Sequence, residues 1–520
     1  MIMRIFLTKF PHISAYIALV SATIRHSFAG KACLLIGITA VLYGLLINNL
    51  NLWTDEIYSV LMAKDSLGDM FHLLLTEDSK PPLYYLYLKG ILALFPNEYE
   101  IWGAHFASYI LLLAAQLFAV TEVRKDYGDR TALWLVALML LMPQSLWLAF
   151  EVRTYMLSAF LMLAALVYGL RVSEQPELRD YFKLGAATVL ALYSHYYCAL
   201  WLMFLYLFLL ADILRARRFE QLKPFLATAG AAALLFAPWL AVPLSTGGEI
   251  SRNWYVTMDF VRVSAQFFTT PPAAEIWQSP FFIATTLAAT SLTFIVICGV
   301  TDTAGGKMTK PDSNSKLLTT AAGTVLATYL LLILLSVTVR PMVTTRYMYI
   351  FSLIWYAAGA AVLAKSSFLP RGFIIIALLG FAGTYGDFKA AFFDRGFYNL
   401  AHDIKAFVPK DKPILAFDNN NLFCEYYLPE HTCLAIVGAD GEILRRPSVM
   451  KNIALYGKEP GEVTFTLSSY GQMRNNKDCL NYKSAYRISH GTDLCKLDAA
   501  HVRQLLKESL DLRLNKYERH

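Results

Sequence analysis

Long apolar segments alternate with short polar loops along most of the chain. A helix that crosses a hydrocarbon core of about 30 Å needs roughly 20 apolar residues. Segments of about this kind occupy residues 32–50, 101–121, 131–149, 154–172, 182–197, 198–214, 224–244, 281–300, 317–339, 347–364 and 368–386. After residue 386 the apolar runs shorten, and Pro, Asn and charged residues become frequent. The pattern predicts a polytopic α-helical membrane domain over residues 32–386 and a soluble domain over 387–520.

One further apolar segment, Pro81–Phe95, is too short for a full span. It opens with two prolines, which are favoured in the first turn of a helix. We expect a half-span or re-entrant helix here, because a full span would reverse the orientation of every later loop.

The loop charges predict the orientation. The loop 212–223 carries Arg215, Arg217, Arg218 and Lys223, and the loop 365–371 carries a lysine and an arginine. Short loops rich in Lys and Arg face the cytoplasm. A first external loop at 51–80 and the domain 387–520 are then expected on the outer, periplasmic side of an inner membrane. Residues 1–31 are expected to be a cytoplasmic segment; a cleaved signal peptide is the alternative.

The soluble domain is expected to be an α+β domain. Alternating residues predict strands at Pro413–Phe417 and Val463–Leu467, and leucine spacing predicts a helix at Asp498–Leu514. The domain also contains four cysteines, Cys424, Cys433, Cys479 and Cys495. An even number in an oxidising compartment favours two disulfides, most simply 424–433 and 479–495. A zinc site is the alternative, disfavoured because no pair has close C-x-x-C spacing.

Composition agrees with a membrane protein. Of the 520 residues, 56% are hydrophobic and 16% are charged, and the mean hydropathy is +0.44. The net charge of +7 is modest and resides mostly in short loops. It therefore reflects topology, and no nucleic-acid partner is expected.

Two adjacent carboxylates, Asp55 and Glu56, follow the first span behind Trp53. An acid of this kind at a membrane surface is suited to act as a general base for a hydroxyl. The alternative is that one of them simply caps the next helix. A second group in the same loop contains Asp78, Lys80, Tyr84 and Tyr85. Lys80 would hold a phosphate or form a surface ion pair.

Other outer turns carry similar residues. Glu151-Val152-Arg153-Thr154-Tyr155 begins one span, His195 and Tyr196 occupy another turn, and Arg346-Tyr347 opens a late span. Ionisable residues at such depths are candidates for a functional site. A snorkelling arginine and a structural histidine are the alternatives.

The order of these motifs resembles the GT-C membrane glycosyltransferases. They are Asp55-Glu56, Lys80-Pro81-Pro82-Leu83-Tyr84-Tyr85, Glu151-x-Arg153-x-Tyr155, His195-Tyr196 and Arg346-Tyr347. The resemblance covers roughly residues 35–390 and is greatest for the group with bacterial relatives of dolichyl-phosphate-mannose protein mannosyltransferases, lipid A aminoarabinose transferases and rhizobial galacturonosyl transferases. It implies a GT-C fold with about 11–13 transmembrane helices and a polyprenyl-phosphate sugar donor.

Carried over to this sequence, the resemblance implies that Asp55 is catalytic, with Glu56 its neighbour in the motif. Lys80, Arg153, Tyr155 and Arg346 are then expected to bind the donor phosphate. The residues expected to bind substrate are Asp78, Tyr84, Tyr85, His195 and Tyr347. The aminoarabinose transferases resemble this chain at Lys-Pro-Pro, but they have a metal-binding Glu where this chain has Ser79. A divalent cation is therefore left as an open prediction, with Asp78 and His195 as candidate ligands.

The predicted reaction is transfer of a sugar to a hydroxyl of a glycan, lipid or protein acceptor among the membrane lipids of the cell envelope, with inversion at the anomeric carbon. A transporter or flippase of a lipid-linked saccharide is the alternative from another class. Such transporters tend to have internal repeats and charged, broken helices near the midplane. This chain shows no clear repeat, and its charged residues lie at the outer turns. A non-catalytic subunit or sensor is a third alternative.

Overall fold

A computed structural model describes residues 27–47, 51–78, 80–174, 176–250, 282–304, 312–339, 342–343, 345–366 and 369–393, with shorter stretches between 401 and 467. The chain forms two compact units. The bundle unit contains the chain up to Asn48, Lys80–Tyr84 and His105–Ala390. The sheet unit contains Asn49–Ser79, Tyr85–Ala104 and the chain from Ala391 onward.

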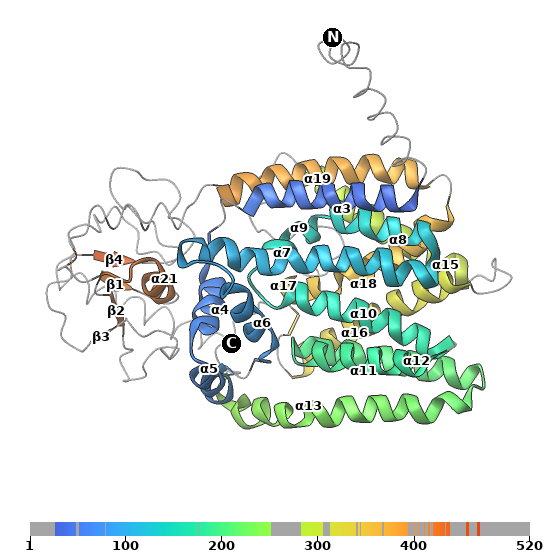
Figure 1. Ribbon diagram of the computed structural model, residues 1–520, viewed down its shortest axis with the longest axis horizontal. Helices are drawn as coiled ribbons and strands as arrows, with labels where there is room; N and C mark the ends of the chain where they lie inside the picture. The colour runs from blue at the N-terminus through green and yellow to red at the C-terminus, as the bar shows by residue number, and fades with distance from the viewer. Residues whose placement is uncertain are drawn as a thin grey trace, which may run out of the picture. The chain divides into compact units, whose positions relative to one another are not determined.

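The bundle unit is helical (Figure 1). Its helices, the first residues of α7 and the last of α19 excepted, are α3 (Phe28–Ile47), α7 (Glu100–Phe118), α8 (Arg124–Leu141), α9 (Pro143–Phe150), α10 (Tyr155–Glu174), α11 (Leu178–Leu192), α12 (Tyr196–Arg215), α13 (Leu222–Ile250), α15 (Phe282–Ala304), α16 (Ser313–Thr338), α17 (Thr345–Met348), α18 (Ser352–Lys365) and α19 (Leu369–Phe393). Short π- or 3₁₀-helical turns occur at η3 (Ala119–Val123), η4 (Phe219–Gln221) and η7 (Tyr349–Phe351).

Each predicted span corresponds to a described helix. By length and hydropathy, eight helical segments of the described chain can cross a membrane, one of which, Asn97–Leu141, contains both α7 and α8. The predicted span 131–149 is broken, because Pro143 begins a new helix and Met142 before it is extended, with φ −77° and ψ 137°. At the other end of the domain, α19 continues past the predicted boundary at residue 386 to Phe393.

The core of the bundle lies around α18 and α10. Of the residues in the candidate spans, 89% are buried in Arg346–Lys365 and 83% in Tyr155–Glu174, against 22% in Phe219–Pro243. Glycines bring α15 and α18 together: a Cβ at Gly299 would collide with Val362, and one at Gly359 with Leu292.

The first and last spans of the bundle lie side by side, as Figure 1 shows for α3 and α19. The Tyr385 hydroxyl donates a hydrogen bond to the Leu42 carbonyl oxygen at 3.3 Å, and the Tyr43 and Phe381 rings stack with centroids 6.3 Å apart.

The sheet unit combines the first loop with the C-terminal region. Its helices are α4 (Thr54–Lys64), α5 (Leu67–Leu73), η1 (Leu74–Asp78), most of α6 (Leu83–Leu92), η2 (Asn97–Tyr99) and α21 (Asn420–Tyr427). The four described strands are β1 (Ile414–Ala416), β2 (Cys433–Ile436), β3 (Ala454–Tyr456) and β4 (Phe465–Leu467), paired in parallel in the order β3-β2-β1-β4. Helix α21 connects β1 to β2, since parallel neighbours need a crossover.

The strands predicted at 413–417 and 463–467 are confirmed as β1 and β4. The apolar segment after the two prolines forms α6, whose ten residues are too few to cross a bilayer. The helix predicted at 498–514 lies outside the described residues.

Candidate active site

Three backbone segments of the bundle unit meet at one end of the helices. Helices α10, α11 and α12 are joined by short turns, so the start of α10, the end of α11 and the start of α12 lie at the same end. The Thr154 hydroxyl donates to the Ser194 carbonyl oxygen at 2.8 Å, and the Leu83 amide donates to the Tyr193 carbonyl oxygen at 3.1 Å. The Lys80–Tyr84 segment is thereby attached to the turn that carries His195.

Three aromatic rings from different helices lie around His195, and a fourth ring stacks on one of them. The centroid of the His195 ring lies 5.1 Å from that of Tyr197, 5.3 Å from that of Tyr347 and 6.1 Å from that of Tyr155. Tyr347 also lies 5.2 Å from Tyr197, and Trp147 stacks on Tyr155 at 5.5 Å. Residues predicted from three separate motifs are thus brought into one aromatic group.

Two cations belong to the same group. Burial, followed by the positive charges of Arg153 and Lys80, lowers the pKa of His195 to about 3. The imidazole is therefore neutral at pH 7. Its Nδ1 accepts a hydrogen bond from the Tyr197 amide at 3.1 Å, which places the proton of the neutral ring on Nε2. We call Lys80, Arg153, Tyr155, His195, Tyr197 and Tyr347 the cation–aromatic cluster.

Arg153 is positioned by the end of α9. The last carbonyl groups of that helix are fixed from α7: His105 Nδ1 donates to the Phe150 oxygen at 2.6 Å, and Ser108 Oγ donates to the Glu151 oxygen at 2.6 Å. Arg153 follows in the turn before α10, and only 8% of it is exposed. Because the break at Pro143 starts the short helix α9, which ends at Phe150, the turn with Arg153 falls between α9 and α10.

Arg346 and Tyr347 reach the cluster from the short helix α17. The Ser336 hydroxyl accepts the amides of Met342 and Val343 at 2.9 and 3.1 Å, and the Tyr197 hydroxyl donates to the Met342 carbonyl oxygen. These bonds hold the segment before α17 against α12. Arg346 is partly exposed and places a further positive charge beside Tyr347.

In the sheet unit, Asp55 and Glu56 have different surroundings although they are adjacent. Both lie in the first turn of α4, where the helix dipole favours negative charge. Glu56 is 1% exposed, and its Oε2 accepts the Trp53 amide at 3.1 Å, which caps the helix. Asp55 is partly exposed. Glu56 therefore has a structural role, and its predicted catalytic role stays a prediction, as does that of Asp55.

The remaining predicted substrate residues lie around α6. Tyr85 is 4% exposed, and its hydroxyl donates to Asp78 Oδ2 at 3.3 Å within the sheet unit. Tyr84 is 2% exposed and belongs to the bundle unit. The motif therefore contributes side chains to both units.

Sequence reasoning missed Tyr197, Trp147 and Tyr427. Tyr197 follows the predicted His195-Tyr196 pair, and Trp147 lies in a predicted span, so neither differs in pattern from many other aromatics. Tyr427 contacts Leu52 from 375 positions along the chain, and no local pattern signals such a contact.

The described residues contain no group of three or more His, Cys, Asp or Glu side chains that could hold a metal ion. A divalent cation held by Asp78 or His195 therefore stays a prediction, and we assign no step to one. The disulfides also stay a prediction: Cys424 is buried in α21 and Cys433 begins β2, whereas Cys479 and Cys495 lie outside the described residues.

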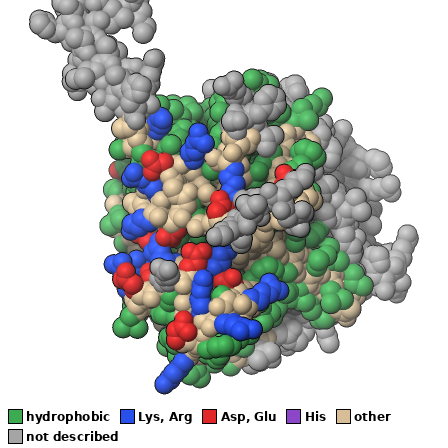
Figure 2. Space-filling model, turned by 90° about the vertical axis from the view of Figure 1, so that its right-hand side faces the viewer, with side chains coloured by type: hydrophobic (Ala, Val, Ile, Leu, Met, Phe, Trp, Pro, Cys, Tyr) green, Lys and Arg blue, Asp and Glu red, His purple; other side chains and the backbone are tan. Residues whose placement is uncertain are grey.

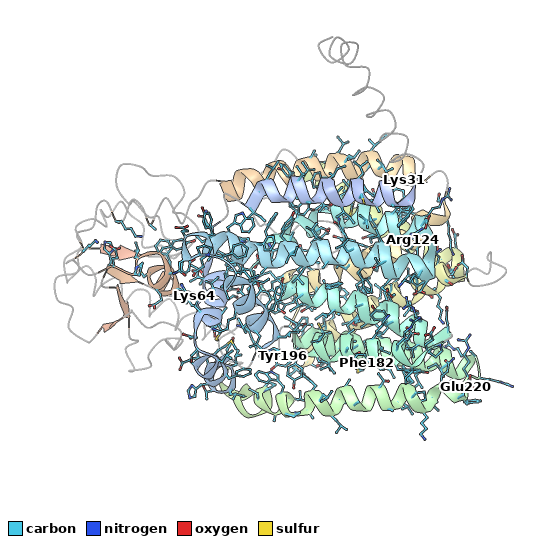
Figure 3. The ribbon with its side chains drawn as sticks, viewed as in Figure 1. Lys31, Lys64, Arg124, Phe182, Tyr196 and Glu220 are labelled. Carbon is cyan, nitrogen blue, oxygen red and sulfur yellow. The ribbon has the colours of Figure 1, made fainter. Side chains whose placement is uncertain are left out.

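The opposite end of the bundle is rich in charge. Figure 2 shows Lys and Arg side chains gathered with Asp and Glu over this end, and Figure 3 places Arg124 and Glu220 there, away from Tyr196. Arg171 contacts Asp126 at 2.7 Å, Glu122 at 2.9 Å and Asp180 at 3.5 Å, and so connects η3 and α8 to α10 and α11.

Comparison with known proteins agrees with this architecture. A family model described as dolichyl-phosphate-mannose-protein mannosyltransferase matches residues 79–241, which include Lys80, Arg153 and His195. The structure of ArnT from Cupriavidus metallidurans bound to undecaprenyl phosphate matches with 14% identity and a TM-score of 0.52, over 82% of this chain and 90% of that chain.

The apo state of the same protein matches with 14% identity and a TM-score of 0.42, over 80% of this chain and 87% of that chain. Curated proteins give no match. The family model thus matches the part of the chain that contains Lys80, Arg153 and His195, and the undecaprenyl-phosphate-bound structure shares the fold of this chain.

Proposed function

We propose that this protein transfers a sugar from a polyprenyl-phosphate donor to an acceptor hydroxyl at the periplasmic face of the inner membrane, with inversion. A lipid-linked sugar glycosyltransferase in the general sense agrees with the family model and the fold. The observation that carries the finer proposal is that the segments of Lys80 and Arg153 are both bonded to the turn that carries His195.

Lys80 and Arg153 are assigned to the donor phosphate. The guanidinium offers a bidentate fork to phosphate oxygens, and the ammonium adds a point charge. As the bond between sugar and phosphate breaks, negative charge grows on the leaving phosphate. Fixed cations at that place stabilise the transition state more than the ground state.

The surrounding rings suit the sugar. Tyr155, Tyr347 and Tyr197 offer apolar faces, and His195 offers an uncharged Nε2–H donor. A neutral donor adds no charge to those already provided by the two cations. We assign these side chains to binding and orienting the donor.

Asp55 is assigned as the general base. Its carboxylate takes the proton of the acceptor hydroxyl, and the acceptor oxygen forms a bond to the anomeric carbon. The bond from that carbon to the phosphate oxygen breaks, and its electron pair leaves with the prenyl phosphate. One displacement inverts the anomeric centre, so no second nucleophile is required.

The periplasmic orientation rests on charge. Arg124 and Lys125 begin α8, and Arg215 ends α12 shortly before Arg217, at the end of the bundle opposite the cation–aromatic cluster. Ends rich in Lys and Arg face the cytoplasm, so the cluster is assigned to the other face. The acceptor belongs to the cell envelope; mass spectrometry of envelope glycolipids from a deletion strain tests lipopolysaccharide first.

The decisive experiment is Asp55→Asn in purified protein supplied with a prenyl-phosphate sugar and an envelope extract as acceptor. A general base contributes about 10²- to 10⁴-fold, so we expect product formation to fall by at least about 10²-fold while the donor Kd is unchanged. The matched control is Asp69→Asn, an exposed acid in the first turn of α5, which should retain wild-type turnover.

If Asp55→Asn turns over donor like the wild type, the proposal is wrong. A transporter would instead move the lipid-linked sugar across vesicles without forming product, in the wild type and in the Asp55→Asn variant alike.

A further inference from the structure

The C-terminal region contacts the segment that leads into α4 through one side chain. Tyr427, the last residue of α21, makes two hydrogen bonds to the backbone of Leu52: the Leu52 amide donates to the Tyr427 hydroxyl at 2.9 Å, and the hydroxyl donates to the Leu52 carbonyl oxygen at 3.2 Å. Leu52 is separated from α4 only by Trp53. The contact therefore lies three residues before Asp55.

Both partners are buried. Leu52 is 0% exposed and Tyr427 6% exposed, so water has little access to the two backbone groups that Tyr427 satisfies. A buried backbone amide or carbonyl without a partner is strongly disfavoured. The hydroxyl therefore supports one backbone position with both a donor and an acceptor.

The Tyr427 ring is itself held in place. Its centroid lies 5.1 Å from that of Phe423 and 4.9 Å from that of Tyr426. The Tyr426 hydroxyl donates to Glu100 Oε1 at 2.8 Å, and Glu100 Oε2 accepts from Lys64 at 2.7 Å. The Tyr427 ring is thus held by its two neighbouring rings, and the Tyr426 hydroxyl adds a separate contact to Glu100.

The far end of α4 is also held by α6. Lys89 on α6 donates to the carbonyl oxygens of Ala63 and Asp65 at 3.1 and 2.6 Å, at the end of the helix. With that end held by α6, the direction of the first turn depends on how the chain enters the helix. Tyr427 holds the backbone of Leu52 at that entry.

We propose that Tyr427 is a positioning residue, whose hydroxyl holds the Leu52 backbone so that the first turn of α4 keeps Asp55 in its reactive place. The C-terminal domain then serves catalysis through α21. This inference rests on the proposed role of Asp55. It extends that role, because an acid misplaced by about 1 Å can lose on the order of 10²-fold in rate.

The test is Tyr427→Phe, which removes the hydroxyl and keeps the ring. We expect kcat to fall about tenfold or more, with the KM for prenyl-phosphate sugar unchanged, because Tyr427 is not among the residues assigned to the donor. The matched control is Tyr426→Phe, the adjacent tyrosine on the same helix, whose hydroxyl bonds to Glu100 and not to the entry of α4. Its kcat should stay within about twofold of wild type.

Amide hydrogen exchange supplies a second measurement. In wild-type protein the Leu52 amide should exchange as slowly as the amides inside α4, and Tyr427→Phe should speed exchange at Leu52 and the first turn only. Fast exchange of Leu52 in the wild type overturns the inference, even if Tyr427→Phe does not fold. A kcat of Tyr427→Phe equal to that of Tyr426→Phe also overturns the inference. An active Asp55→Asn would instead overturn the proposed function.

Discussion

The cation–aromatic cluster and the first turn of α4 place charge in different ways. In the cluster, residues distant in sequence meet because helix ends coincide, and Arg153 is held by carbonyl groups that α7 fixes. In α4, the adjacent acids Asp55 and Glu56 have different roles, because the Trp53 amide donates a hydrogen bond to Glu56. The comparison teaches that residues far apart in the sequence can share one site, whereas adjacent residues can have different roles. Burial and hydrogen bonding decide which of the two occurs.

The largest effect that tests this comparison is expected for donor binding when Arg153 is changed. Arg153→Gln should raise the donor Kd about 10- to 100-fold, because hydrogen bonds to charged groups contribute about 1.5–3 kcal/mol. Titration of purified protein with a prenyl-phosphate sugar measures this change. Arg179→Gln, which changes an exposed arginine that pairs with nearby Glu177, is the control. A fall in kcat at unchanged donor Kd would show that Arg153 acts in the chemical step and not in donor binding.

The second prediction concerns pH. The folded pKa of His195, about 3, lies below its unfolded value of about 6.5. Between these values the unfolded chain takes up a proton that the folded chain excludes, so stability falls as pH falls from about 6.5 toward 3. The melting temperature should fall more between pH 7.5 and pH 5 for the wild type than for His195→Gln.

Turnover itself should show no step from His195 between pH 5 and 8. A step near 6.5 that disappears in His195→Gln would mean that the ring titrates normally and that the two cations lie farther from it.

A third, smaller effect tests the separation of the two acids. Glu56→Ala removes the acceptor of the Trp53 amide and should cost about 0.5–2 kcal/mol of stability, as lost helix caps do. Glu56→Gln keeps an acceptor oxygen and should melt close to wild type. If Glu56→Gln melts normally but loses turnover as Asp55→Asn does, both acids share the chemistry and the separation is wrong.

The smallest effect is expected at Lys64. Its side chain is 48% exposed where it pairs with Glu100, and such surface pairs contribute about 0–1 kcal/mol. Lys64→Met should therefore change the melting temperature by little and leave turnover unaltered. A large loss of activity would show that the pair at the end of α4 matters for turnover as much as the contact of Tyr427 before its start.

Much of the fold follows from local pattern. Apolar length placed a helix at each predicted span, eight described segments being long enough to cross a membrane, and alternation placed β1 and β4, because burial in lipid or in a sheet imposes its own periodicity. The motif order also gave the candidate residues. The break at Pro143 was missed, since an apolar run conceals a proline that begins a new helix.

By itself, the sequence determined which segments are helical, which end of the bundle is basic, and which ionisable residues stand at helix ends. These are properties of single segments and of the solvent around them. Only the tertiary structure decided that Tyr197 packs on His195, that Glu56 caps while Asp55 stays partly exposed, and that Tyr427 supports Leu52. Such contacts depend on directional bonds between distant segments, and these exist only once packing has fixed the side chains.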